Sequence, residues 1–219
     1  MTNEPSQTAD RTEPTDWPAY YRHTLGREPR PLFVRGLAAA AATGLRPGRA
    51  IDVGFGDGTE TLSLLDAGWQ VLAIDPTEAA AAGLRSRVSP MAANRLEIRT
   101  VPADVESLPP FDLLYAGFAL SFIAPGAFPA FWSGVRRQLR PGGLLVVNVF
   151  GDRDSWVVDP AMTFADRATV DALFDGLEVI EIVEEDADGE AFSGPKHWHV
   201  FHVIARRPIP AAGAGVPST

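Results

Sequence analysis

The stretch Ala50-Ile51-Asp52-Val53-Gly54-Phe55-Gly56-Asp57-Gly58-Thr59 decides the fold of this chain of 219 residues. Its first residues predict a buried strand ending in an acid, and its three alternate glycines predict a tight turn before a helix over about 60–65. Glycine frees the backbone to turn and lets a ligand lie directly on the main chain. The helix start adds free N–H groups and a positive dipole end. This segment therefore predicts a turn that binds a small molecule.

The spacing of the glycines argues against a nicotinamide or flavin. Their fingerprint reads Gly-x-Gly-x-x-Gly, whereas here the third glycine comes one residue early and Thr59 takes its place. Asp52, two residues before the first glycine, is also poorly placed for a doubly charged pyrophosphate. A ligand with a cationic amino-acid end would accept that carboxylate. The alternative interpretation is a glycine turn that only connects a strand to a helix.

Two further acids follow predicted strands. The strand over 69–74 ends at Asp75-Pro76, and Asp75 lies 19 residues after Gly56. An acid at this place can accept both ribose hydroxyls of a nucleoside, although capping of the helix over 77–87 would also explain it. The strand over 96–101 is followed by Ala103-Asp104-Val105. Three acids at three successive strand ends favour a nucleoside-containing ligand.

The form Asp-x-Gly-x-Gly-x-Gly at 52–58 resembles motif I of the class I S-adenosylmethionine-dependent methyltransferases. The turn Leu139-Arg140-Pro141-Gly142-Gly143 is a second point of resemblance, and together the likeness covers roughly 32–207. It implies S-adenosylmethionine as cofactor and S-adenosylhomocysteine as product, with Asp104 holding the adenine amino group. The overall pattern looks like the short bacterial proteins of the tellurite-resistance type. The cofactor-binding residues expected from motif and resemblance are Asp52, Gly54, Phe55, Gly56, Gly58, Asp75, Pro76, Asp104, Val105 and Gly117.

The order of elements predicts one α/β domain over 16–207. Strands and helices alternate up to residue 150, which predicts a parallel sheet with helices on both faces. A strand over 177–183 then leads through an acidic turn over 184–194 to a last strand over 196–206, and strands joined by a loop alone pair antiparallel. The family implies a Rossmann-like seven-stranded sheet of order 3-2-1-4-5-7-6. We expect a disordered tail over 1–15 and a flexible tail over 208–219.

Composition limits which methyl acceptors and which cellular compartment we expect. The formal net charge of −9 argues against nucleic-acid binding. The Asn-Pro-Pro-aromatic motif of base-amino methyltransferases is replaced by Gly117-Phe118-Ala119-Leu120. Without cysteine, disulfides and thiolate-bound zinc are excluded. With no signal peptide or apolar membrane span in the sequence, we expect a cytoplasmic, bacterial protein, monomer or homodimer, that acts on a small molecule away from membranes and nucleic acid.

The predicted helix over 17–25 is a candidate lid. A tyrosine could close over the cofactor while an arginine meets a carboxylate; packing of an amphipathic helix on the domain would explain the pattern equally well. The loop over 151–156 follows the fifth strand, and such loops often carry function. The residues expected in the substrate pocket are Tyr20, Tyr21, Arg30, Trp156, Lys196 and Trp198.

The run Lys196-His197-Trp198-His199-Val200-Phe201-His202 has an unusual local composition. Strand alternation puts His197, His199 and Phe201 on one face and Trp198, Val200 and His202 on the other. A His-x-His pair can bind a metal, but packing at a sheet edge explains it better, so no metal is expected. A general base is needed only for a protonated hydroxyl or amine acceptor; the candidates are His197, His23 and Tyr21.

The sequence thus favours in-line methyl transfer from S-adenosylmethionine to a small molecule through an O, N, S or C atom. Holding donor and acceptor close and aligned can supply much of the rate. One alternative is a protein of this fold that binds the cofactor without methyl transfer, as a regulator or cyclase, because fold does not fix function. A nicotinamide-dependent oxidoreductase is disfavoured by the glycine spacing and by Asp52.

Overall fold

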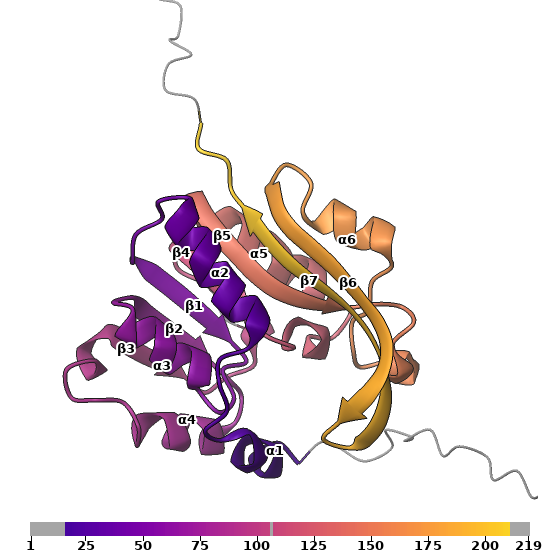
Figure 1. Cartoon of the computed structure of the whole chain (residues 1–219), viewed down its shortest axis with the longest axis horizontal. Coiled ribbons are helices and arrows are strands. Elements are labelled where there is room, and N and C mark those ends of the chain that lie inside the picture. The colour runs from indigo at the N-terminus through magenta and orange to yellow at the C-terminus, as the bar shows by residue number, and fades with distance from the viewer. Residues whose placement is uncertain (1–15, 106, 211–219) are drawn as a thin grey trace, which may run out of the picture.

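A seven-stranded sheet of order β3-β2-β1-β4-β5-β7-β6 forms the centre of the molecule (Figure 1). It is seen in a computed structural model that describes residues 16–105 and 107–210. Strands β1 to β5 are parallel, and β7 runs antiparallel to both β5 and β6, which confirms the expected architecture and order. The strands are β1 Arg49–Val53, β2 Gln70–Ile74, β3 Leu96–Arg99, β4 Phe111–Ala116, β5 Leu139–Phe150, β6 Glu178–Ala191 and β7 Gly194–Arg206. The tail expected over 1–15 and most of the one over 208–219 lie outside the described residues.

Helices cover both faces of the sheet. The helices are α1 Trp17–Thr24, α2 Pro31–Ala42, α3 Thr59–Asp66, α4 Glu78–Arg85, α5 Phe128–Gln138 and α6 Arg167–Leu173. One apolar core packs α2, α3 and α4 against one face, and a second core packs α5 and α6 against the other. None of the helices in the described part of the chain combines the length and apolarity needed to cross a membrane.

Local sequence explains where several helices begin. Pro31 occupies the first turn of α2, where its missing N–H costs nothing. The Asp166 side chain accepts the Thr169 N–H and caps α6. Gly58 precedes α3 with a φ of 74°, a left-handed conformation that glycine adopts freely. The helix after the glycine turn therefore begins directly at the carboxyl end of β1.

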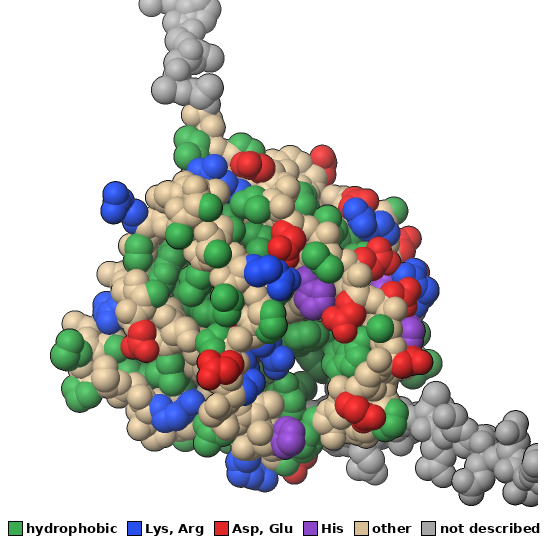
Figure 2. All heavy atoms as spheres, in the orientation of Figure 1, with side chains coloured by type: hydrophobic (Ala, Val, Ile, Leu, Met, Phe, Trp, Pro, Cys, Tyr) green, Lys and Arg blue, Asp and Glu red, His purple; other side chains and the backbone are tan. Residues whose placement is uncertain are grey.

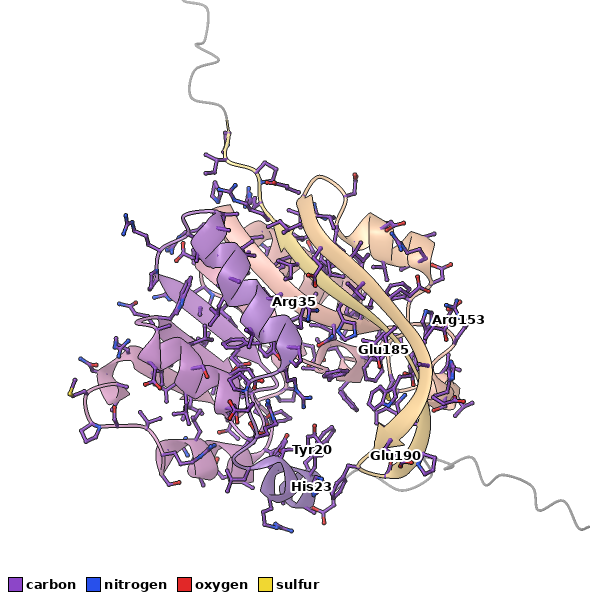
Figure 3. All side chains as sticks on the ribbon, in the orientation of Figure 1. Tyr20, His23, Arg35, Arg153, Glu185 and Glu190 are labelled. Atoms are coloured by element: carbon purple, nitrogen blue, oxygen red, sulfur yellow. The ribbon has the colours of Figure 1, made fainter. Side chains whose placement is uncertain are left out.

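The acidic segment over 184–194, expected as a turn, is strand, and the turn expectation was wrong. β6 continues to Ala191 and pairs with β7 in a long hairpin that turns at Phe192 and Ser193. Cationic groups compensate the crowded carboxylates: Arg153 contacts Glu184 and Asp186 at 2.7 Å each. Arg35 of α2 reaches across to Glu181 at 2.8 Å and ties the base of the hairpin to the domain (Figure 3). The hairpin therefore extends past the sheet toward α1.

Candidate functional site

A cavity of about 1220 Å³ lies at the carboxyl ends of the central strands. Its floor is the β1–β4 edge, where strand order reverses and where open α/β sheets bind ligands. α1 and the tip of the hairpin meet above it, because Phe192 packs against Tyr20 and His23 with ring centroids 5.7 and 5.3 Å apart. Figure 2 shows this face hollowed between α1 and the hairpin, with hydrophobic side chains inside. Residues distant in the sequence thus enclose one space.

The glycine turn forms bare backbone on the wall of this cavity. Gly54 and Gly56 have φ values of 68° and 52°, both in the left-handed region. A Cβ on Gly54 would come within 2.5 Å of the Ala119 methyl carbon, and one on Gly56 within 3.0 Å of the Tyr21 ring. Gly58 faces α4 instead, since a Cβ there would meet Leu84 at 2.9 Å. Two of the three glycines shape the ligand wall, and the third allows α3 to pack on α4.

The Asp75 carboxylate is the polar centre of the wall beside the turn. It accepts the Gly56 N–H at 3.1 Å and the Thr77 N–H at 2.9 Å. The Tyr21 hydroxyl donates to it as well, at 3.2 Å. Burial raises the pKa of Asp75. Burial and the neighbouring carboxylate raise the pKa of the Tyr21 phenol, so that this hydroxyl stays protonated and donates. Asp75 thus holds a hydroxyl against the bare glycine backbone.

Arg27 anchors the segment after α1 to the glycine turn. Its guanidinium contacts Asp57 at 2.8 Å and Glu60 at 2.6 Å. Both carboxylates are buried. Burial alone would raise the pKa of Asp57, but the Thr59 N–H and the Arg27 charge hold it below its ordinary value. Sequence reasoning missed this cluster because no local pattern links Arg27 to acids about thirty residues away.

Asp52 is buried beneath this cluster at the end of β1 and lines the cavity. Burial raises the pKa of Asp52 to about 8, the Thr61 hydroxyl bond opposes the rise, and the charges of Glu60 and Asp57 add to it. A cationic group of a ligand would favour its ionised form. Asp52 therefore suits the cationic end of a ligand better than a phosphate.

A buried hydroxyl and a cation without a carboxylate partner mark the β4 side of the cavity. The Tyr115 hydroxyl is the one buried side-chain polar atom in the described residues that has no hydrogen-bond partner. It lies where a side chain on Gly117 would stand, at 2.2 Å from that Cβ position. Arg30 also lines the cavity; its guanidinium donates to the Tyr20 hydroxyl at 2.9 Å and lies 4.9 Å above the Phe118 ring centroid. A hydroxyl donor and a guanidinium together suit a carboxylate.

Aromatic rings line the part of the cavity away from the glycine turn. Trp156 follows β5, Trp198 belongs to β7, and their ring centroids lie 5.9 Å apart. Phe118 packs edge-on against Trp198 at 5.8 Å, and Trp17 of α1 packs on Phe122 at 5.0 Å. Phe118 has a φ of 58°, which is strained for a bulky residue. Its N–H donates to the Asn148 side-chain oxygen at 3.2 Å, which helps to hold that conformation.

Glu185 of β6 lines the cavity (Figure 3) and begins a short series of hydrogen-bonded side chains. His202 Nε2 lies 2.9 Å from Glu185 Oε2, and its Nδ1 lies 2.8 Å from the Asn148 amide nitrogen. The amide N–H donates, so His202 Nδ1 accepts and Nε2 carries the proton toward Glu185. Sequence alternation placed His202 on the Trp198 face, but nothing in the sequence paired it with an acid.

The other predicted cofactor residues are distributed as follows. Phe55, Pro76, Asp104 and Gly117 line the cavity. Asp104 is exposed in the short helix η2 Ala103–Val105, and the Val105 side chain lies outside the described residues.

Five of the six predicted pocket residues line the cavity, as do two of the three candidates for a general base, Tyr21 and His23. Tyr20, Tyr21, Arg30, Trp156 and Trp198 are on its wall, and His23 stands exposed at its mouth. Lys196 is buried outside it, paired with Asp154. His197 is outside as well, held by Asp186 at 2.8 Å and Asp188 at 2.7 Å. Strand alternation puts His197 on the face opposite Trp198, where the hairpin acids hold it. Lys196 shares the Trp198 face, but its ammonium lies against the Trp156 and Trp198 rings and is paired with Asp154.

A small cluster on the hairpin has the donor atoms of a metal site. Glu184, Asp186 and His199 bring ligand atoms within 4.8 Å of one another. The Arg153 guanidinium contacts all three, lying 3.0 Å from His199 Nε2. A fixed positive charge among these donors disfavours a cation there, and the cluster serves to join β6 to the loop after β5.

Comparison with known proteins finds a family match for part of the chain and a shared fold for most of it. A sequence model described as a methyltransferase domain matches residues 50–143, from β1 to the turn inside β5. This match covers less than half of the chain, and solved structures of methyltransferases share the fold of most of the rest. No curated protein matches the chain in sequence.

Solved structures share the fold of this chain at low sequence identity. TehB from Haemophilus influenzae superposes with a TM-score of 0.67 and 15% identity over 80% of this chain and 62% of TehB, so the chain spans less than two thirds of that protein. The N-methyltransferase NodS from Bradyrhizobium japonicum, in complex with S-adenosylhomocysteine, gives 0.64 and 14% over 89% of this chain and all of NodS, 100%. The 1,6-didemethyltoxoflavin-N1-methyltransferase of Burkholderia thailandensis gives 0.61 and 19% over 87% of each chain.

Proposed function

We propose that the chain transfers a methyl group from S-adenosylmethionine to a small-molecule acceptor bound in the aromatic part of the cavity. The observation that carries this proposal is Asp75, which already holds a hydroxyl, that of Tyr21, against the bare backbone of Gly56. A ribose presents hydroxyl donors of the same kind. The enclosed space of about 1220 Å³ leaves room for an acceptor beside the cofactor.

Different residues around the cavity would bind different parts of the cofactor. Asp75 would accept the ribose hydroxyls once the Tyr21 hydroxyl moves aside, with the adenine toward Asp104. The Tyr115 hydroxyl and Arg30 would bind the methionine carboxylate, which gives the unpartnered Tyr115 hydroxyl an acceptor. Asp52, on the same wall, would face the cationic groups of the cofactor.

S-adenosylmethionine supplies a methyl group already activated by a positively charged sulfur. The chain therefore needs no strong electrophile of its own. Its residues hold the two reactants close and aligned, which can lower the barrier by about 7–11 kcal/mol. α1 and the hairpin tip cover the cavity and keep water away from the reacting atoms.

Calorimetric titration with S-adenosylmethionine, S-adenosylhomocysteine and NADH tests the proposed cofactor site. We expect both adenosyl ligands to bind and NADH to give no heat. Asp75→Asn should weaken S-adenosylhomocysteine binding at least tenfold, because each hydrogen bond to a charged acceptor contributes about 1.5–3 kcal/mol. Asparagine is preferred to alanine here, since the side chain also accepts two backbone N–H groups.

Asp112→Asn is a matched control for that substitution. Asp112 also accepts a backbone N–H, that of Arg49 at 2.8 Å, but it lies at the opposite end of the strands. We expect this control to keep wild-type affinity. Equal affinity of Asp75→Asn and wild type would contradict the placement of the ribose. Methyl transfer itself is tested by S-adenosylhomocysteine release that depends on added acceptor, which a regulator would not show.

A further inference from the structure

The acceptor half of the cavity combines aromatic walls with carboxylates at its mouth. Glu185 and Glu190 of β6 both line it, and Figure 3 shows Glu190 at the hairpin tip opposite Tyr20 and His23 of α1. We propose that the acceptor is an amine that this half binds in its positively charged form, an inference that rests on the proposed methyl transfer.

The aromatic rings provide faces that attract a cation. Trp156, Trp198 and Phe118 form a continuous wall with centroid separations of 5.8–5.9 Å. Ring faces attract ammonium groups electrostatically, Trp most strongly. The protein itself places a cation there: Lys196 Nζ lies 4.3 Å from the centroids of both Trp156 and Trp198. Asp154 neutralises that ammonium, so it leaves little net positive charge to repel a ligand.

The carboxylates that β6 brings to this half have few partners, although the Arg30 guanidinium lies 4.9 Å from the Phe118 ring centroid. Glu190 has no hydrogen-bond or ion-pair partner among the residues that the structure describes. Glu185 is joined to His202 alone, at 2.9 Å. The two arginines on the cavity wall are committed elsewhere, Arg27 to Asp57 and Glu60 and Arg30 to the proposed cofactor carboxylate. A carboxylate acceptor would therefore face like charges, while an ammonium would face opposite ones.

Methyl transfer to an amine moves charge in the direction that this environment favours. The bound ammonium first releases one proton to solvent at the mouth of the cavity. The nitrogen lone pair then forms the N–C bond as the C–S bonding pair returns to sulfur, so the positive charge passes from sulfur to nitrogen. Carboxylates and ring faces on the nitrogen side stabilise the charge that develops there in the transition state.

Matched probes test the inference separately from the proposed function. The full chain is first titrated with S-adenosylhomocysteine; binding there supports the cofactor site alone. The loaded protein is then titrated with 2-phenylethylamine, 2-phenylethanol and 3-phenylpropionate, which share a ring and differ in charge. We expect the amine to bind at least about tenfold tighter than the other two. We also expect it to give an N-methylated product with S-adenosylmethionine.

Variants show whether the preference comes from the named acids. Glu185→Gln combined with Glu190→Gln should remove most of the preference while S-adenosylhomocysteine still binds. Glu178→Gln, at the far end of β6 and 3.8 Å from Arg206, should leave it unchanged. If the cofactor binds but the alcohol or the carboxylate binds as tightly as the amine, the inference is overturned and the proposed function stands. If S-adenosylhomocysteine does not bind, both the amine acceptor and the proposed methyl transfer are contradicted.

Discussion

At the scale of single residues, the Tyr21 hydroxyl occupies the hydrogen-bonding position on Asp75 that the expected ligand would take. The Tyr21 hydroxyl donates to the carboxylate that would accept the ribose, and its ring lies on Gly56. Tyr21→Phe removes the hydrogen bond that the cofactor must break and keeps the ring. We therefore expect S-adenosylhomocysteine to bind about three- to tenfold tighter, as measured by calorimetry. Weaker binding would mean that the phenol contacts the cofactor directly.

Asp52 makes stability depend on pH. Its pKa rises from the ordinary 3.8 to about 8 on folding, so between these values the folded chain holds a proton that the unfolded chain has lost. The contribution of Asp52 to the free energy of unfolding is fully present below about pH 4 and is lost as the pH rises through about 8. Asp52→Asn removes the titration and keeps the shape.

The melting temperature of Asp52→Asn should exceed that of wild type by an amount that grows from pH 5 to pH 8. The difference in melting temperature should grow by roughly 2–4 °C for each kcal/mol of stability that wild type loses through Asp52. Asp66→Asn, an exposed acid at the end of α3, should show no such trend. A difference that stays constant with pH would contradict the burial of an ionisable Asp52.

At the scale of elements, one guanidinium joins the segment between α1 and α2 to the glycine turn. Arg27→Met would leave the buried Asp57 and Glu60 carboxylates without their cation. We expect the free energy of unfolding to fall by about 3 kcal/mol, measured by urea denaturation with and without S-adenosylhomocysteine. Arg22→Met, on the exposed side of α1, should change it little. Equal stability of both variants would show that the loop is held by its apolar contacts instead.

At the scale of the whole molecule, the cavity is lined by residues from α1 near the start of the chain to β7 near its end, so a ligand there should stabilise the folded state globally. S-adenosylhomocysteine at one hundred times its Kd should add about 2.7 kcal/mol, which raises the melting temperature by roughly 5–10 °C. NADH at the same concentration is the control. A melting temperature unchanged by the adenosyl ligand would place it outside this cavity.

The parts of the site that sequence predicted are those carried by short segments. The Asp52-to-Gly58 turn and Asp75 follow strands directly, so strand ends and glycine spacing were enough to bring them to one edge. The Arg27 cluster, the unpartnered Tyr115 hydroxyl and the Glu185–His202 pair could not be predicted. Each depends on how distant elements pack, and no local pattern records that packing. The hairpin was underestimated because its acids suggested a solvated turn, whereas Arg153 compensates Glu184 and Asp186, and His202 contacts Glu185 across the strands.

The sequence by itself determined the order of strands and helices, the glycine turn and the acids at three strand ends, because periodicity and backbone preferences act over a few residues. Only the tertiary structure decided which side chains share the cavity. It brought Trp198 to the cavity wall, buried Lys196 beside Asp154, and held His197 with the acids of β6. It also brought α1 under the hairpin tip. Such choices depend on burial, charge compensation and close packing between segments far apart in the chain, which are properties of the folded molecule alone.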